Sequence, residues 1–152
     1  MPLRILGEDP QDLFLNGLKF ANDHDQRNEA QFQVGYNHRR SGLYVTFSGR
    51  YDSGVPADVE PGTTLADFVA QGFDPRLYNE IDFQRGRVRQ RTILDFSVGA
   101  DLMQKERVSM NVQFDIQNLT NELFLYNFES VFSGTHVGFP RLFSGRFSLR
   151  FK

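Results

Sequence analysis

The sequence of 152 residues contains no Cys and no Trp. Without cysteine, disulfide frameworks, thiolate zinc sites and cysteine nucleophiles are all excluded. Neither sign of charge is in clear excess, because 17 Lys and Arg residues stand against 19 Asp and Glu residues. Binding to nucleic acid needs a basic surplus or patch, so we expect no nucleic-acid partner.

Long hydrophobic runs are also missing. A transmembrane helix needs about 20 mostly apolar residues, whereas the longest apolar run here, from Leu123 to Tyr126, has four. Residues 1–11 turn polar without the apolar stretch of a signal peptide, so we expect no export signal in the chain. Two classes of protein are left. One is a soluble domain, and the other is a membrane β-structure, whose strands look polar on average because only alternate residues meet lipid.

The strongest pattern that the sequence does contain is alternation with period two. Apolar and polar residues alternate over the ten positions from Val108 to Gln117, which is the spacing of a strand and not of a helix. Four other segments repeat this pattern. The sequence therefore predicts an all-β fold, an antiparallel meander of five long strands. They lie near residues 29–37, 43–52, 91–102, 108–117 and 142–151.

The two faces of these predicted strands differ in charge. None of the 25 positions on the apolar faces is charged, and in the third strand that face runs from Thr92 to Leu102. The charged positions all lie on the opposite faces: Arg50, Asp52, Arg91, Asp95, Asp101, Asp115, Arg146 and Arg150. Large aromatic residues lie on the apolar faces: Phe47, Phe96, Phe114, Phe147 and Phe151. The pattern predicts one apolar and one polar surface.

The connections between the predicted strands alternate in length. His38–Gly42 and Met103–Arg107 have five residues each, whereas Ser53–Gln90 has 38 and Asn118–Arg141 has 24. Structureless loops longer than about 12–15 residues are uncommon in compact domains. Outer-membrane barrels combine short turns on one side with long loops on the other, on strands of about 9–11 residues. We therefore predict part of a transmembrane β-barrel, with the charged positions lining the lumen and the five Phe residues facing lipid.

The residues themselves resemble a known family. The segment FDIQNLTNELFLYNFESVFSGTHVGFPRLFSGRFSLRF resembles the last two strands and the last extracellular loop of TonB-dependent outer-membrane receptors, particularly the Oar-like group. NDHDQRNEAQFQVGY, GLYVTFSGRYDSGVP and RGRVRQRTILDFSVGADL resemble earlier strands of the same barrels. Two positions depart from the family pattern. Phe139 stands where this group usually has a second Pro, and Lys152 follows Phe151 where these proteins commonly end on the aromatic residue.

This resemblance implies a barrel of 22 strands whose lumen holds a plug domain. Five strands cannot close such a barrel, so residues 1–152 are expected to be its C-terminal fragment, without the plug and the TonB box. The implied partners are the rest of the barrel and plug, outer-membrane lipid of a Gram-negative cell, and the barrel-assembly machinery that reads the last strand. The TonB complex would be reached only through the missing N-terminal part.

The expected role is a share in the uptake of a bulky nutrient by the intact receptor, without transport by this chain alone. Siderophore, cobalamin, glycan and peptide remain open as substrates. The alternative is a small soluble β-barrel or sandwich that binds a ligand. In that case the apolar faces of the strands would form a shared core.

Catalytic and metal-binding motifs are absent. His24, His38 and His136 lack the spacing that places two imidazoles on one helix face, so we expect no metal site and no cofactor. Asp23 and Asp25 beside His24 are typical of a solvated turn. No G-x-S-x-G elbow or phosphate-binding glycine loop is present, so we expect no enzymatic activity.

Two features of the 53–90 connection carry further predictions. The stretch from Thr63 to Val69 has a capping hydroxyl before apolar residues, which predicts one or two helical turns. Alternating arginines lead into the third strand: Arg85, Arg87, Arg89 and Arg91. They either line a mouth that attracts an anionic ligand or pair with neighbouring acids such as Asp82 and Asp95, and the second is the plainer interpretation.

Overall fold

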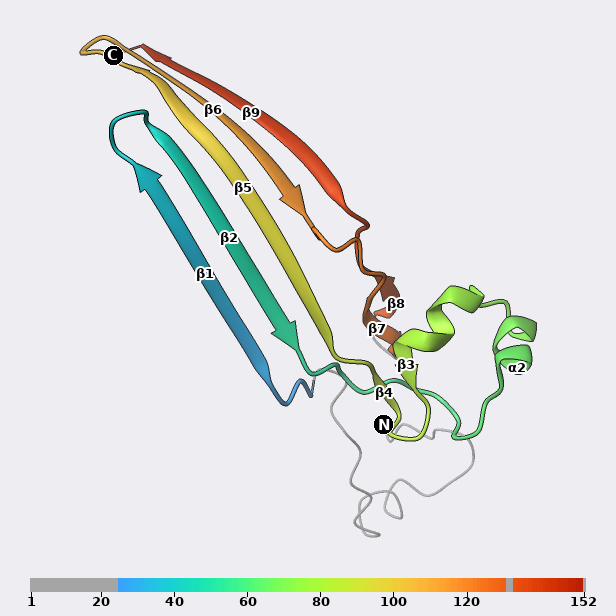
Figure 1. Cartoon of the computed structure of the whole chain (residues 1–152). Coiled ribbons are helices and arrows are strands. Elements are labelled where there is room, and N and C mark those ends of the chain that lie inside the picture. Colours follow the sequence, from blue (N-terminus) through green and yellow to red (C-terminus); the bar gives the residue numbers. More distant parts are fainter. Residues whose placement is uncertain (1–24, 131–132, 152) are drawn as a thin grey trace, which may run out of the picture.

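The computed structural model describes residues 25–130 and 133–151 (Figure 1). Its main feature is an antiparallel sheet of five strands in the order β1-β2-β5-β6-β9. The strands are β1 (Glu29–His38), β2 (Leu43–Asp52), β5 (Arg91–Gln104), β6 (Val108–Gln117) and β9 (Leu142–Phe151). The predicted meander is confirmed. The sheet is open, with β1 and β9 as its edges.

The cross-strand register brings the apolar faces of the strands together. Phe47 of β2 pairs with Val34 of β1 and with Phe96 of β5. Ile116 of β6 pairs in turn with Phe96 and with Phe143 of β9. Residues directly opposite each other in an antiparallel pair lie on the same face. The apolar sides of all five strands therefore form one continuous surface.

Strand β5 departs from the prediction at its end. It continues to Gln104, and a register shift between Asp101 and Met103 leaves Leu102 without a cross-strand partner. Such a β-bulge inserts one extra residue and so changes the phase of the strand that follows. Met103 pairs with Met110 and continues the apolar face in place of Leu102. The strand therefore ends two residues beyond the predicted end near Leu102.

The short and the long connections lie at opposite ends of the sheet (Figure 1). The turns at 39–42 and 105–107 lie at one end, which we call the turn end. The long connections lie at the other, the loop end, and each folds into elements of its own. The 53–90 connection holds α2 (Leu65–Ala70), η1 (Pro75–Glu80), β3 (Ile81–Asp82) and β4 (Arg87–Val88). The 118–141 connection holds β7 (Leu125–Ser130) and β8 (Gly134–Val137).

Helix α2 confirms the helical turns expected between Thr63 and Val69. Thr64 is the N-cap, and its hydroxyl accepts a hydrogen bond from the Asp67 backbone N–H at 3.3 Å. The Asp67 carboxylate in turn accepts from the Thr64 backbone N–H at 3.1 Å. This reciprocal pair is a capping box, which satisfies donors that have no partner within the helix.

The buried core of the described residues lies between the two long connections and not on the sheet. We call it the loop core. Its buried members are Phe68, Leu77, Ile81, Val88, Leu125 and Phe128. Phe68 is 1 % exposed, and its ring centroid lies 4.9 Å from that of Phe73 and 5.6 Å from that of Phe128. The two connections are therefore held together by aromatic packing.

The apolar face of the sheet is left uncovered by the described residues. Phe114, Phe147 and Phe151 are 43 %, 64 % and 76 % exposed, and all ten residues of each edge strand are exposed. Phe47 and Phe96 are half-buried by their neighbours on the same face. Within the described part of the chain, no helix is long and apolar enough to cross a membrane.

Replacing Phe68 with Ala should loosen the loop core without changing the sheet. We expect the opening free energy of the loop amides to fall by about 3–5 kcal/mol, because a buried aromatic ring leaves a cavity. Hydrogen exchange of the chain in detergent measures this locally. Leu65→Ala, a 46 % exposed position on the same helix, should change the same amides by less than about 0.5 kcal/mol. Equal effects of the two variants would contradict the assignment of the core.

Candidate functional site

The polar face of the sheet carries all eight of the predicted charged positions. Paired residues share a face, and Asp52 pairs with Arg91 while Gln113 pairs with Arg146. The eight do not form one site. Four of them gather at the loop end of the sheet: Arg50, Asp52, Arg91 and Asp95. Three others line a separate groove of about 300 Å³ towards the turn end: Asp101, Arg146 and Arg150. The last, Asp115, accepts a hydrogen bond from Ser97 at 2.5 Å.

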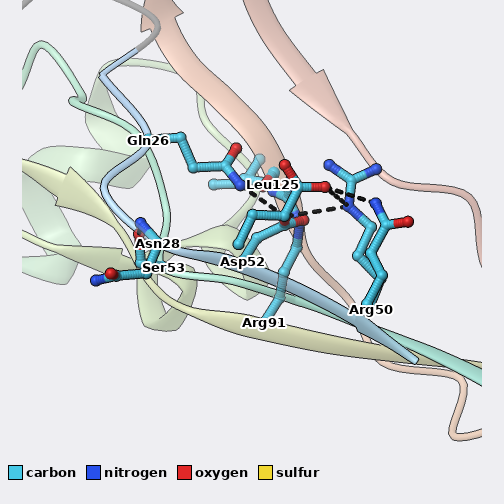
Figure 2. A network of polar contacts seen from close by, with 9 residues as sticks. Gln26, Asn28, Arg50, Asp52, Ser53, Arg91 and Leu125 are labelled. Carbon is cyan, nitrogen blue, oxygen red and sulfur yellow. Dashed lines mark hydrogen bonds and ion pairs between the residues drawn. The ribbon is translucent and has the colours of Figure 1, made fainter.

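Asp52 is the centre of the loop-end group (Figure 2). It is 1 % exposed at the end of β2, and its carboxylate accepts from the Arg91 Nε at 2.8 Å. It also accepts from the Gln26 amide at 2.7 Å and from the Arg50 Nε at 3.0 Å. A buried charge is tolerated only when it is paired and hydrogen-bonded. Here the three donors supply both the ion pairing and the hydrogen bonds that the buried Asp52 carboxylate needs.

Arg91 links this carboxylate to the 118–141 connection. It is 5 % exposed, and its guanidinium also donates to the backbone carbonyl of Leu125. The guanidinium carbon lies 5.4 Å from the ring centroid of Phe124 and 4.7 Å from that of Tyr126. Such cation–π contacts are stronger when the cation is removed from water. The pair Asp52–Arg91, with these contacts, therefore fastens β7 to the ends of β2 and β5, and we call it the loop anchor.

Asn118 shapes the base of the same connection. Its backbone has a φ of 51°, the left-handed region that Asn adopts more readily than other side chains. Its backbone N–H donates to the Asp95 carboxylate at 2.9 Å, and its side-chain amide donates to the carbonyls of Glu122 and Phe139. Both limbs of the connection are thus joined where they leave the sheet.

Gly138 makes room for the ring of Phe124. A Cβ atom on Gly138 would lie 2.1 Å from the Phe124 Cζ, which no side chain accepts without a shift. The Gly138 backbone N–H donates to the Phe124 carbonyl at 2.8 Å. Packing therefore explains the second glycine of the sequence GTHVG, because its lack of a side chain lets the ring of Phe124 lie against Arg91.

A pocket of about 180 Å³ lies between the polar face and this connection, and we call it the loop-end pocket. The sheet supplies its charged wall and the connection supplies aromatic rings. Its lining includes Arg50, Asp95, Gln117, Phe124, Tyr126 and Phe139. Tyr126 and Phe139 are 43 % and 71 % exposed. Ring edges and polar groups in one concave site are the usual composition of a ligand pocket.

Sequence reasoning found the charged half of this pocket and missed the other half. Arg50 and Asp95 lie on strands, where period two predicts the face. Gln117 ends the alternating segment that begins at Val108, and the alternation gives its face but no functional role. The aromatic residues belong to a connection whose fold the alternation does not describe. The only available signals were the apolar run from Leu123 to Tyr126 and the departure from the family pattern at Phe139.

Three of the alternating arginines, Arg85, Arg87 and Arg89, line one pocket of about 390 Å³, whereas Arg91 lines the loop-end pocket. Arg85 forms an exposed ion pair with Asp82 at 3.7 Å, as expected. Arg87 pairs with Asp25 at 3.4 Å, and Arg89 donates to the Ile81 carbonyl at 3.4 Å. Arg91 pairs with Asp52 and not with Asp95, because Asp52 is its cross-strand partner.

The histidines are dispersed. His38 lies at the end of β1, where its Nδ1 is 2.8 Å from the Ser41 hydroxyl, and His136 lies on β8. Asp23 and His24 lie outside the described residues. Among residues 25–130 and 133–151, no group of three or more His, Cys, Asp or Glu side chains is arranged to hold a metal ion.

One carboxyl group at the loop end, that of Glu80, has a raised pKa. Burial raises the pKa of the Glu80 carboxyl above its ordinary value of 4.5, and the negative charge of Glu122 raises this pKa further, while Arg89 opposes both. Glu80 lies on η1 and Glu122 on the 118–141 connection. At neutral pH the two carboxylates therefore repel each other across the junction of the two long connections.

Comparison of the chain with protein-family models, with curated proteins and with solved structures finds no match.

Breaking the loop anchor should release β7 from the sheet. Removing one partner of a buried ion pair costs about 3–5 kcal/mol, so we expect Asp52→Ala to lower the opening free energy of the β7 amides by that order. The double variant Asp52→Ala, Arg91→Met should cost less than the sum of the single changes, because it leaves no unpaired charge. Hydrogen exchange of the chain in detergent is the measurement.

The matched control is the exposed pair of Arg85 and Asp82. Arg85 is 81 % exposed, so Arg85→Ala should change the same amides by less than about 0.5 kcal/mol. Unchanged β7 protection in Asp52→Ala would show that the anchor does not hold this connection.

Neutralising Glu80 should stabilise the loop end at neutral pH. Because its pKa is raised in the folded state, the charged form costs stability above that pKa, and the cost disappears below the ordinary value. We expect Glu80→Gln to gain less than about 1 kcal/mol at pH 7, as for exposed charge pairs. Hydrogen exchange at pH 7 and at pH 4 should show the gain shrinking at the lower pH. A gain that grows on acidification would contradict this account.

Proposed function

We propose that this chain forms the C-terminal five strands and two outer loops of a TonB-dependent outer-membrane receptor, which takes up a bulky nutrient. One observation carries the proposal. The continuous apolar face of the sheet is uncovered, while the buried core of the described residues lies beyond the loop end. An apolar surface of this extent marks a place where lipid or another protein surface is met.

The edges of the sheet support closure by further strands of the receptor. β1 and β9 each present a row of backbone groups without a neighbouring strand in the described chain. In hydrocarbon every backbone polar group must be satisfied, so the sheet must be completed into a barrel. Because the sheet has five antiparallel strands, its edge strands β1 and β9 run in the same direction. A barrel in which all neighbouring strands are antiparallel can then be closed only by an odd number of further strands. The roughly 17 strands that remain of a 22-stranded barrel meet this condition.

Aromatic residues at the two ends of the apolar face also fit strands that cross a membrane. Aromatic girdles lie at both interfaces of outer-membrane barrels. Tyr36 and Phe151 lie towards the turn end of their strands, and Tyr51 and Phe143 lie towards the loop end. With the turn end on the periplasmic side, the loop core and the loop-end pocket face the outside of the cell. The eight charged residues of the polar face then face the lumen and the plug.

The alternative, a self-contained soluble binding module, requires the apolar residues of the sheet to share an interior. Phe114 and Phe147 would have to be covered, and they are 43 % and 64 % exposed. The uncovered face therefore favours the receptor.

A single introduced tryptophan tests the assignment of the faces, because the chain has no Trp of its own. Phe147 lies on the apolar face and its neighbour Ser148 on the polar face. In micelles that contain a nitroxide-labelled detergent, the Phe147→Trp variant should be quenched at least about twofold more strongly than Ser148→Trp, because alternate residues meet the apolar phase.

The same preparations give a second readout. Without detergent the chain should aggregate on size exclusion, and with detergent it should run as a defined micellar species. A monodisperse monomer in aqueous buffer, or equal quenching of the two variants, would overturn the proposed function.

A further inference from the structure

We propose that the loop-end pocket binds one pyranose ring, so that the substrate of the receptor carries carbohydrate. The site is built entirely from described residues. Its place on the outer side of the membrane rests on the proposed function, whereas binding of the ring does not. No feature of the sequence pattern assigns this site.

The volume of the pocket suits a single ring. An interior cavity of about 150 Å³ is large enough to admit benzene, and the loop-end pocket, which is partly open to solvent, has a volume of about 180 Å³. A larger substrate would therefore place one ring in the pocket and the rest of the molecule outside it. Tyr126 and Phe139, which are both exposed, stand at the opening towards solvent.

The charges of the wall favour an uncharged ring. Arg50 and Arg91 are balanced by Asp52 and Asp95, so the lining residues have no net formal charge. The guanidinium of Arg91 and the carboxylate of Asp52 are already paired in the loop anchor. An isolated anion or cation would therefore gain little here and would lose its hydration.

The polar groups that remain are both donors and acceptors. Arg50 contacts Asp52 at 3.0 Å and Glu29 at 3.4 Å through its Nε alone, so its terminal amino groups have no partner within the described residues. Asp95 uses one oxygen to accept from the Asn118 backbone, which leaves its other oxygen as an acceptor. Gln117 lies beside them with an amide that both donates and accepts. Hydroxyl groups also do both, so several hydroxyls around one ring match this wall.

The opposite wall is aromatic. Phe124, Tyr126 and Phe139 come from the 118–141 connection, and Phe124 and Tyr126 are held against Arg91. Aromatic side chains suit ligands with one apolar and one polar side. A pyranose has C–H faces and a rim of hydroxyls, so it can lie against the rings while its rim meets Arg50, Asp95 and Gln117. A plain aromatic ring would leave that polar wall without partners, which is costly.

The test uses the full chain in a zwitterionic detergent, because maltoside and glucoside detergents would compete with the probe. In the Phe139→Trp variant the new indole keeps an aromatic ring in the pocket and is the only tryptophan. Titration with methyl α-glucoside, methyl α-galactoside and methyl α-mannoside should change its fluorescence with a Kd on the order of 1 mM for at least one sugar. Benzoate and phenol at the same concentrations should give no saturable change.

Truncations of the pocket separate binding from folding. Saturation-transfer NMR should detect the bound glycoside with the unsubstituted chain. Phe139→Ala and Gln117→Ala should each weaken binding at least fivefold. The control Phe143→Ala removes a 61 % exposed ring from the apolar face nearby and should leave binding unchanged. Unchanged hydrogen exchange in β7 confirms that the variants keep the loop anchor.

The outcomes are decisive in either direction. Saturable binding of a glycoside that Phe139→Ala and Gln117→Ala weaken and Phe143→Ala does not supports the proposal. Failure of all three glycosides, stronger binding of benzoate or phenol, or equal effects of Phe139→Ala and Phe143→Ala would overturn it. The membrane proposal is read separately, from the quenching of Phe147→Trp and Ser148→Trp. Failure of one proposal is therefore distinguishable from failure of the other.

Discussion

An uncovered apolar sheet with two unpaired edges is the constraint on which the rest of this structure depends. The hydrophobic effect favours removing such a face from water, and the backbone groups at the edges need partners wherever water is absent. The described chain provides neither a second layer over the sheet nor a strand beyond β1 or β9. The covering surface and the additional strands must therefore come from outside these residues, and the proposed receptor barrel in lipid supplies both.

The loop end follows a different principle from the sheet. There the chain is organised like a small globular unit, with a capped helix, an aromatic core and short strands. Phe68 and Leu125, from the two long connections, meet in that core. The long connections are therefore ordered by packing, and they form a structured rim at one end of the strands. Order at this rim allows a pocket of definite shape to exist beside the polar face.

Asp52 and Arg91 join these two parts of the molecule. Their positions at the ends of β2 and β5 make them neighbours in the sheet, and the contacts of Arg91 with Leu125, Phe124 and Tyr126 carry the link to β7. Burial of a charged pair is costly, and its value lies less in net stability than in fixing one arrangement. Here the arrangement that it fixes is the position of the aromatic wall of the loop-end pocket relative to its charged wall.

The alternation of residues determined the five strands, their antiparallel order and the face of nearly every side chain, because strand side chains alternate with a period of two that local sequence records directly. It did not foresee the bulge at Leu102, where the phase changes and β5 continues to Gln104. The loop core, the partner of Arg91 and the pocket lined by Phe139 were decided only by tertiary structure. They depend on contacts between the 53–90 and 118–141 connections and the strand ends, and such contacts bring together residues far apart in the chain that share no local periodicity.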